Sequence, residues 1–182
     1  GTAADYPNAD YLVVFDSTQV DVKESGLSYN NMHSLIKVFT KEGARKLNHL
    51  TFDYDPLSAH IDIKKALIYR ADGSIEEVPT QEFYDYPAPA RMIYWGARKK
   101  MINFGHLEPG DAIEIFWFKK GFTYALLQQD EPDDSRYIPP MRGHFYDIVP
   151  FWNDQPVKRK VYEVKVPKSK DLQFKVYNGY IK

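Results

Sequence analysis

Hydrophobic side chains stand at every second position in several segments of this 182-residue chain, and this period constrains the fold more than any other feature of the sequence. Successive side chains of a β-strand point to opposite faces of a sheet, whereas an α-helix repeats every 3.6 residues. Val20 and Val22 alternate with Asp21 and Lys23, which predicts a strand with one buried face. The same alternation predicts three further strands, with these residues on their buried faces: Ile61, Ile63, Leu67 and Tyr69; Ile113, Ile115 and Trp117; Leu172, Phe174 and Val176.

Turn residues separate the alternating segments at intervals typical of a sandwich. Asp72-Gly73 ends one strand, and Gly110 precedes another, each at a position where a turn needs a conformation that only glycine adopts without strain. We therefore predict an all-β fold, an antiparallel β-sandwich of about ten strands with at most one short helix. That helix is expected from about Thr40 to Leu47, with Thr40 as its cap and Gly43 as its weak point.

The domain organisation follows from the same pattern. We expect residues 1–10 to form an N-terminal extension, in which Gly1 is interpreted as the remnant of a cleavage site. Residues 11–182 are expected to form a single β-sandwich domain, because strand-like patterning resumes on both sides of every loop. The chain is also expected to be a fragment of something longer, since residues 176–182 still have the composition of ordered structure.

Composition and charge exclude several classes of function. The chain has 24 Lys and Arg against 25 Asp and Glu, a net charge of −1, so it lacks the cationic surface of a protein that binds nucleic acid. It has no cysteine, which excludes disulfides, thiolate metal ligands and thiol nucleophiles within this chain. No run approaches the roughly 18 apolar residues of a membrane helix. We expect no nucleic-acid partner and no transmembrane segment.

Catalytic, cofactor and metal sites find no support in the sequence. There is no Gly-x-Ser-x-Gly segment to display a nucleophilic serine, and no glycine-rich loop to hold phosphate. The acidic residues 130–134 lack the glycine and the ligand spacing of a calcium loop. A metal-dependent enzyme would have to use histidines that have a carboxylate nearby but no third ligand. Those pairs are His60 with Asp62, His106 with Glu108 and His144 with Asp147. We predict no catalytic residue, no cofactor and no metal.

Aromatic residues, 15% of the chain, are the remaining functional signal. For any single aromatic side chain burial in the core is the first interpretation. Trp95 and Trp152 differ, because they lie next to Gly or Asn in less periodic segments. Exposed rings of this kind stack on sugars or anchor a protein partner. The predicted contact group for a ligand or an interface is Tyr94, Trp95, Arg98 and Trp152.

Five segments of the chain carry a family resemblance. They are residues 36–43, 52–56, 63–74, 107–114 and 161–167, and they span turns and strands between about Tyr11 and Asn178. Together they resemble the bacterial all-β domain of unknown function that lies N-terminal to transglutaminase-like, papain-fold domains. The matching motifs are structural turns and strand signatures, so the resemblance transfers no catalytic residue to this chain.

The resemblance implies an accessory role. We expect a non-catalytic domain of a multidomain exported protein, periplasmic or on the outer surface, that packs on or presents substrate to a downstream transglutaminase-like or cysteine-peptidase-like domain in the same polypeptide. Its ligand would be a glycan or a protein of the cell envelope. The alternative is a stand-alone carbohydrate-binding or protein-binding module that uses exposed aromatic residues.

Overall fold

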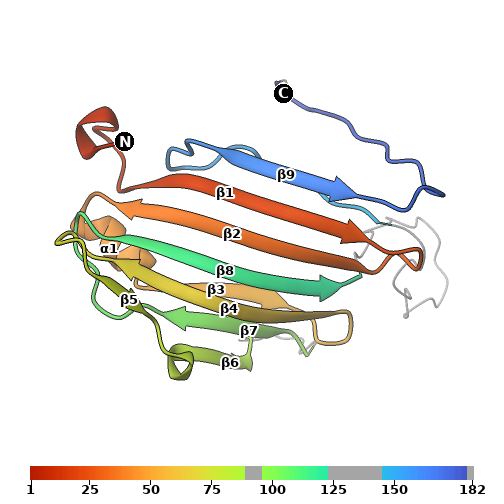
Figure 1. Ribbon diagram of the computed structural model, residues 1–182, viewed down its shortest axis with the longest axis horizontal. Helices are drawn as coiled ribbons and strands as arrows, with labels where there is room; N and C mark the ends of the chain where they lie inside the picture. The colour runs from red at the N-terminus through yellow and green to blue at the C-terminus, as the bar shows by residue number, and fades with distance from the viewer. Residues whose placement is uncertain (89–95, 123–144, 180–182) are drawn as a thin grey trace, which may run out of the picture.

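The computed structural model describes residues 1–88, 96–122 and 145–179, and its strands form two sheets (Figure 1). The larger sheet has six strands in the order β5-β4-β8-β2-β1-β9, and the smaller one has three in the order β3-β7-β6. The prediction of an all-β, sandwich-like fold is confirmed. The strands are β1 (Tyr11–Val22), β2 (Ser28–Val38), β3 (His49–Tyr54), β4 (Ala59–Tyr69), β5 (Ile75–Glu77), β6 (Phe83–Pro87), β7 (Arg98–Asn103), β8 (Ala112–Gly121) and β9 (Lys160–Lys165).

Neighbouring strands are antiparallel except at one edge of the larger sheet. There β9 runs parallel to β1, with Asp16 opposite Lys160 and Thr18 opposite Tyr162. The helical elements are short: the 3-10 turns η1 (Ala3–Asp5) and η2 (Thr80–Glu82), and one α-helix, α1 (Lys41–Leu47). In the part of the chain that the structure describes, no helix combines the length and the apolar character needed to cross a membrane.

The short helix forms where the sequence predicts it. Thr40 has extended backbone angles and its hydroxyl accepts a hydrogen bond from the Gly43 N–H at 3.0 Å, which is N-capping by side chain. Gly43, Ala44 and Leu47 are the buried residues of α1. The helix therefore closes one end of the core with a small apolar face.

The hydrophobic core lies where the smaller sheet packs on β4 and β8. Alternate residues of β8, Ile113 and Ile115, are at most 1% exposed. On the other strands of the larger sheet, β1 contributes only Tyr11 to this cluster and β9 contributes none of its described residues. This cluster thus occupies one half of the sandwich, and Leu12, Val20 and Val22 of β1 are buried outside it. Its buried members are Val38, Ala44, Leu47, Ile63, Ala66, Ile68, Val78, Ile102, Phe104, Leu107, Ile113 and Ile115.

A β-bulge in β4 overturns part of the predicted alternation. Ile61 and Ile63 are buried as expected, but the register against β8 shifts between Ile63 and Lys65. The extra residue at the bulge moves every later side chain to the opposite face of the sheet. Ala66 and Ile68 therefore enter the core. Leu67 and Tyr69, predicted on the buried face, lie on the other face and are half-buried.

The strand predicted around Leu172, Phe174 and Val176 is absent. Residues 171–179 form no strand, and all of them are exposed, Phe174 by 77%. Alternation creates a strand only where a neighbouring strand supplies a ladder of hydrogen bonds. Figure 1 shows this segment leaving the larger sheet beyond β9. Both predicted turn glycines have positive φ angles, +89° at Gly73 and +101° at Gly110.

Candidate functional site

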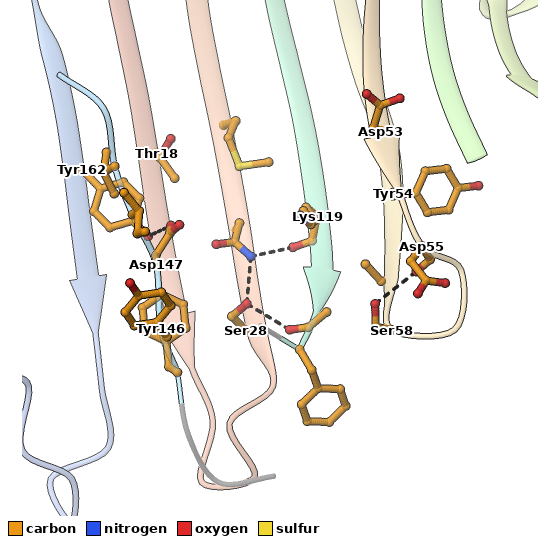
Figure 2. A pocket seen from close by; sticks show the side chains of 18 of the residues that line it. Thr18, Ser28, Asp53, Tyr54, Asp55, Ser58, Lys119, Tyr146, Asp147 and Tyr162 are labelled. Carbon is orange, nitrogen blue, oxygen red and sulfur yellow. Dashed lines mark hydrogen bonds between the residues drawn. The ribbon is translucent and has the colours of Figure 1, made fainter. Parts of the chain in front are cut away.

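A groove of about 610 Å³ lies on the inner face of the larger sheet, where the smaller sheet stops. Its floor is formed by β2 and β8, one wall by the end of β3 with residues 55–59, and the other by residues 145–150 with β9 (Figure 2). We call this hollow the β3 groove. Segments distant in sequence meet there, because the ladders β2–β8 and β1–β9 bring their inward-facing side chains into adjacent rows.

The floor of the β3 groove changes from apolar to polar along its length. Met32 and Trp117 are opposite each other in the β2–β8 ladder and form the apolar part, with the Trp117 ring 4.4 Å from the Phe52 ring. Asn30 donates hydrogen bonds to the Ser28 hydroxyl at 3.0 Å and to a backbone carbonyl of β8 at 3.2 Å. The floor therefore presents an apolar patch beside an ordered amide and hydroxyl pair.

The β3 wall is held by charged and phenolic groups. The Tyr54 hydroxyl donates to Asp85 at 2.7 Å, and Arg98 pairs with the same carboxylate at 2.8 Å. Burial disfavours the ionised form of Asp85, but the hydrogen bonds from Tyr54 and Arg98 outweigh it and leave the Asp85 pKa below its ordinary value. Asp53 is more exposed and pairs with Lys99 at 2.8 Å.

A side-chain hydrogen bond connects the opposite wall to β9. The Tyr162 hydroxyl donates to Asp147, so residues 145–150 are tied to the edge of the larger sheet. Burial, followed by the hydrogen bond to Asp147, raises the pKa of the Tyr162 phenol, which keeps this donor protonated at physiological pH. Tyr146 lies beside it with 53% of its surface exposed.

The side chains of the β3 groove suit binding better than bond cleavage. Ser28 donates its hydroxyl proton to the Gly121 carbonyl, and Ser58 donates to the Asp55 carbonyl. No histidine is among the described residues that line the groove, so neither serine has an imidazole base beside it in that part of the chain. What remains is a mixed surface of rings, amides, carboxylates and lysines.

The predicted contact group is only partly within the described residues. Tyr94 and Trp95 lie outside them. Arg98 stands in β7, where its guanidinium pairs with Asp85 behind the wall of the β3 groove. Trp152 is 82% exposed and lines a second, smaller hollow of about 270 Å³ with Val13 and Lys160. Arg98 and Trp152 therefore do not form one contact group. Sequence reasoning did not single out Tyr54, Tyr146 and Asp147, which form the walls of the β3 groove.

The histidines considered for a metal site are surface residues where they are described. His60 is exposed on β4, and His106 contacts Glu108 at 3.2 Å with both side chains largely exposed. His144 lies outside the described residues. Sequence reasoning missed His33, which lies on the outer face of the larger sheet. Its ring stacks on Phe116 at 3.9 Å, and its Nε2 is 2.7 Å from Glu114.

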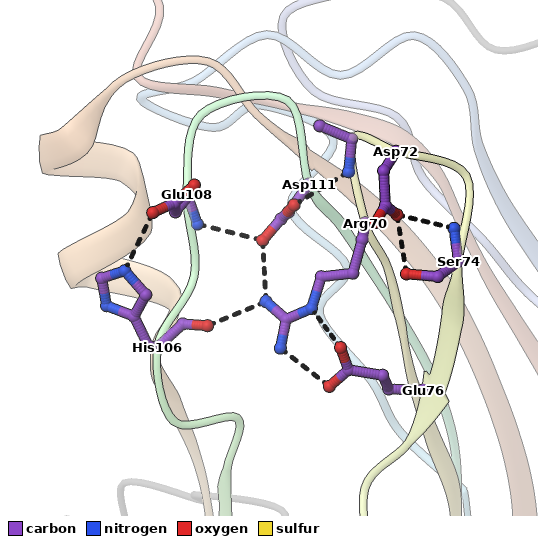
Figure 3. Close-up of polar contacts among 8 residues, drawn as sticks. Arg70, Asp72, Ser74, Glu76, His106, Glu108 and Asp111 are labelled. Atoms are coloured by element: carbon purple, nitrogen blue, oxygen red, sulfur yellow. Dashed lines mark hydrogen bonds and ion pairs between the residues drawn. The ribbon is translucent and has the colours of Figure 1, made fainter.

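A polar network at the far end of the sheets joins two turns (Figure 3). Arg70 contacts Glu76 through two nitrogens, at 2.7 and 2.8 Å, and Asp111 at 2.9 Å. Asp111 is only 3% exposed and also accepts from the backbone N–H of Ala71 at 3.1 Å and of Glu108 at 3.0 Å. Both carboxylate oxygens of Asp111 accept hydrogen bonds, so this network is a structural joint between the β4–β5 and β7–β8 turns.

The Arg70–Glu76 contact predicts acid sensitivity. Hydrogen bonds from Arg70 lower the pKa of Glu76 below its ordinary 4.5. A carboxylate with a lowered folded-state pKa stabilises the fold above the unfolded pKa, and this contribution is lost as pH falls through the folded value. We expect the melting temperature to fall below about pH 4.5, and to fall less steeply in Glu76→Gln. Thermal unfolding at pH 7, 5, 4 and 3 measures this, and identical slopes in both proteins would contradict it.

Comparisons with known proteins identify a family and solved structures that resemble the chain. A family model described as "Domain of Unknown Function with solved-structure structure (DUF3857)" matches residues 24–182. No curated protein matches the chain. The crystal structure of a "putative protease" from Parabacteroides distasonis ATCC 8503 has a TM-score of 0.56 and 15% identity, over 62% of this chain and 23% of that one. The chain thus spans less than a quarter of the length of that protein, and the likeness concerns the fold alone.

Two other solved structures are more distant. The CBM3a-L domain of a cellulosome scaffoldin from Clostridium thermocellum has a TM-score of 0.37 and 13% identity, over 62% of this chain and 68% of that one. An M1 zinc metallopeptidase mutant from Deinococcus radiodurans has a TM-score of 0.35 and 12% identity, over 62% and 20%. TM-scores below 0.5 do not establish a common fold, so we infer nothing about the chain from these two proteins.

Proposed function

Because this chain belongs to the DUF3857 family, a domain of unknown function, we propose that it is a non-catalytic accessory domain of a longer exported protein. In this proposal it binds part of a substrate in the β3 groove and presents it to a transglutaminase-like or cysteine-peptidase-like domain downstream in the same polypeptide. Tethering raises the local concentration of the substrate near the catalytic groups without any new catalytic contact.

The β3 groove is the observation that carries this proposal. It is a hollow of about 610 Å³ whose described lining combines Trp117, Tyr54 and Tyr146 with amides and carboxylates, as binding sites commonly do. The Parabacteroides protein supports the proposal from another direction. A fold similar to this one makes up 23% of that longer chain, which is described as a putative protease. The proposed arrangement is the same: a small domain of this fold within a longer chain that also contains a catalytic domain.

The native protein decides the first half of the proposal. We expect its mass to exceed that of the 182-residue chain, and its peptide map to include sequence beyond Lys182 with Cys, His and Asp in papain-like order. A native protein that ends near Lys182 would contradict the proposal. The alternative, a stand-alone binding module, would then lead. The 82% exposed Trp152 favours that reading most directly and is the first residue to replace in testing it.

A variant of the native protein tests the second half. Tyr146 is an exposed ring in the groove wall, so Tyr146→Ala should leave the fold intact and weaken substrate capture. We expect KM for a protein substrate to rise about fivefold with kcat unchanged, the effect of losing roughly 1 kcal/mol of contact. Tyr177, 74% exposed and outside the groove, provides the control variant Tyr177→Ala. Equal kinetics in both variants would exclude the groove from substrate presentation.

A further inference from the structure

Within the described residues, the strand that borders the β3 groove has an unpaired edge. The smaller sheet has the order β3-β7-β6, so β7 is the one described neighbour of β3. The Phe104 N–H donates to the Asn48 carbonyl at 2.7 Å, and these two residues continue the β3–β7 register. Hydrogen-bonded and non-hydrogen-bonded pairs alternate in an antiparallel ladder. Leu50, Phe52 and Tyr54 therefore bond to β7, and the backbone groups of Thr51 and Asp53 point to the free edge.

No described group satisfies those edge atoms. Among the residues that the structure describes, nothing donates to or accepts from the backbone N–H and C=O of Thr51 and Asp53. Both side chains are exposed on the outer side of the smaller sheet. An open edge of this kind is a template for another strand, and natural proteins use it to bind extended peptides by adding a strand to the sheet.

Beside this edge, the described strands do not complete the second layer of the sandwich. The smaller sheet covers β4 and β8, whereas Asn30 and Met32 of β2 and Thr18 of β1 line the groove instead of the core cluster. A strand added to β3 would lie about 4.8 Å from it and about 10 Å above the larger sheet, over these residues. The free edge of β3 and the groove beside it thus suit the same ligand, an extended strand.

We propose that an extended segment of a protein substrate binds in the β3 groove as a fourth strand of the smaller sheet, hydrogen-bonded to the backbone of Thr51 and Asp53. This rests on the proposed function only for the origin of the segment as substrate. Alternate side chains of the segment point down to Met32 and Trp117 and are apolar. The others point outward beside the Asp53 carboxylate, which pairs with Lys99 at 2.8 Å, and are polar.

The same contacts disfavour a glycan as the ligand. Sugar recognition uses the open face of an aromatic ring, but the Trp117 ring packs against Phe52. The Tyr54 and Tyr162 hydroxyls already donate to Asp85 and Asp147. The edge of β3, in contrast, offers only backbone donors and acceptors in the spacing of a strand. A peptide backbone matches that spacing and a pyranose chain does not.

A labelled peptide tests the proposal on the 182-residue chain. The probe is a fluorescein-labelled nonapeptide of alternating lysine and valine, followed by fluorescence anisotropy. Two derivatives carry N-methyl groups, one on all lysine amides and one on all valine amides, which removes alternate backbone donors but keeps every side chain. We expect at least tenfold weaker binding from only one derivative, because only alternate amides face β3: the lysine series if the added strand is antiparallel, the valine series if it is parallel.

Variants at Asp53 locate the bound strand. Asp53→Pro removes the edge N–H, and proline is tolerated at an edge strand when its N–H is not in the ladder. Asp53→Asn removes the charge and keeps the N–H. We expect at least tenfold weaker binding of the probe to Asp53→Pro and no more than threefold to Asp53→Asn. Far-UV circular dichroism verifies the fold, and if Asp53→Pro unfolds, the N-methyl series on the unchanged chain decides.

Four outcomes would overturn the inference: no binding of the unmodified probe, equal loss from both N-methyl derivatives or from neither, equal binding to the two Asp53 variants when both are folded, and displacement of the probe by cellohexaose or chitohexaose. The kinetics of the native protein distinguish this failure from failure of the proposed function. A Tyr146→Ala effect on KM without strand-like probe binding refutes only the added strand. Strand-like binding without an effect on KM refutes only the presentation of substrate.

Discussion

Replacing Asp111 with alanine is expected to lower the free energy of unfolding by about 3 kcal/mol, because the substitution removes a buried acceptor from three donors at once. Asp111 is 3% exposed and neutralises Arg70, whose side chain is itself only 23% exposed. Without the carboxylate, the Arg70 guanidinium loses its buried partner, and the N–H groups of Ala71 and Glu108 lose their acceptor. Arg70 keeps its contacts with Glu76, so most of the loss comes from the donors that no longer have the Asp111 acceptor.

Thermal and denaturant unfolding measure this loss. For a chain of this size, about 3 kcal/mol corresponds to a fall in melting temperature of roughly 6–12 °C. Asp72→Ala is the matched control: the same substitution in the adjoining turn, at an exposed carboxylate that bonds only within its own turn, to Ser74. We expect a much smaller fall there. Equal melting temperatures for the two variants would show that the Arg70–Asp111 joint does not hold these turns together.

This joint also connects two of the five segments that carry the family resemblance. Residues 63–74 and 107–114 were recognisable as strand-and-turn signatures, but their sequence gives no sign that they touch. In the fold, Arg70 from the first segment and Asp111 from the second form the ion pair at 2.9 Å (Figure 3). A turn can be predicted from its own few residues, whereas the residue that contacts it in the fold depends on which strands pair.

Most of the secondary structure could be predicted, because strands and helix caps depend on local sequence patterns. Val20, Val22, Ile113 and Ile115 are buried as their alternation predicts, and Thr40 caps α1 as its residue type predicts. The β4 bulge was missed because residues 66–69 are apolar at every position, so their alternation fits either register. Nothing in the sequence of a strand specifies where its ladder slips.

The β3 groove could not be predicted because its walls come from distant segments. Asp53 and Asp147 line the same hollow only because the end of β3 and residues 145–150 lie on opposite sides of its floor (Figure 2). Neither segment has an unusual composition. The aromatic signal did identify Trp152 as a candidate contact, and it is exposed, but the groove is built from Tyr54, Tyr146 and Trp117, which the same signal could not separate from core residues.

Gly43→Ala provides the sharpest test of packing against propensity. Alanine is a better helix former than glycine by about 1 kcal/mol, so propensity alone predicts a more stable α1. The structure predicts the opposite, because a Cβ on Gly43 would lie 2.2 Å from the backbone oxygen of Asp10. That oxygen accepts from the N–H groups of Phe39 and Thr40, so moving it breaks the entry to the helix.

We expect Gly43→Ala to lower the free energy of unfolding by about 2 kcal/mol, the clash outweighing the gain in propensity. Asp10 cannot retreat freely, since its carboxylate also accepts from the Thr40 hydroxyl at 2.8 Å and pairs with Lys46 at 2.7 Å. Urea unfolding at pH 7 measures the change. Gly179→Ala, where the added Cβ meets no atom within 4 Å, is the control and should be neutral. A Gly43→Ala variant more stable than the parent would mean that α1 can move away from Asp10 at little cost, and that propensity, not this close approach, sets the stability of the helix.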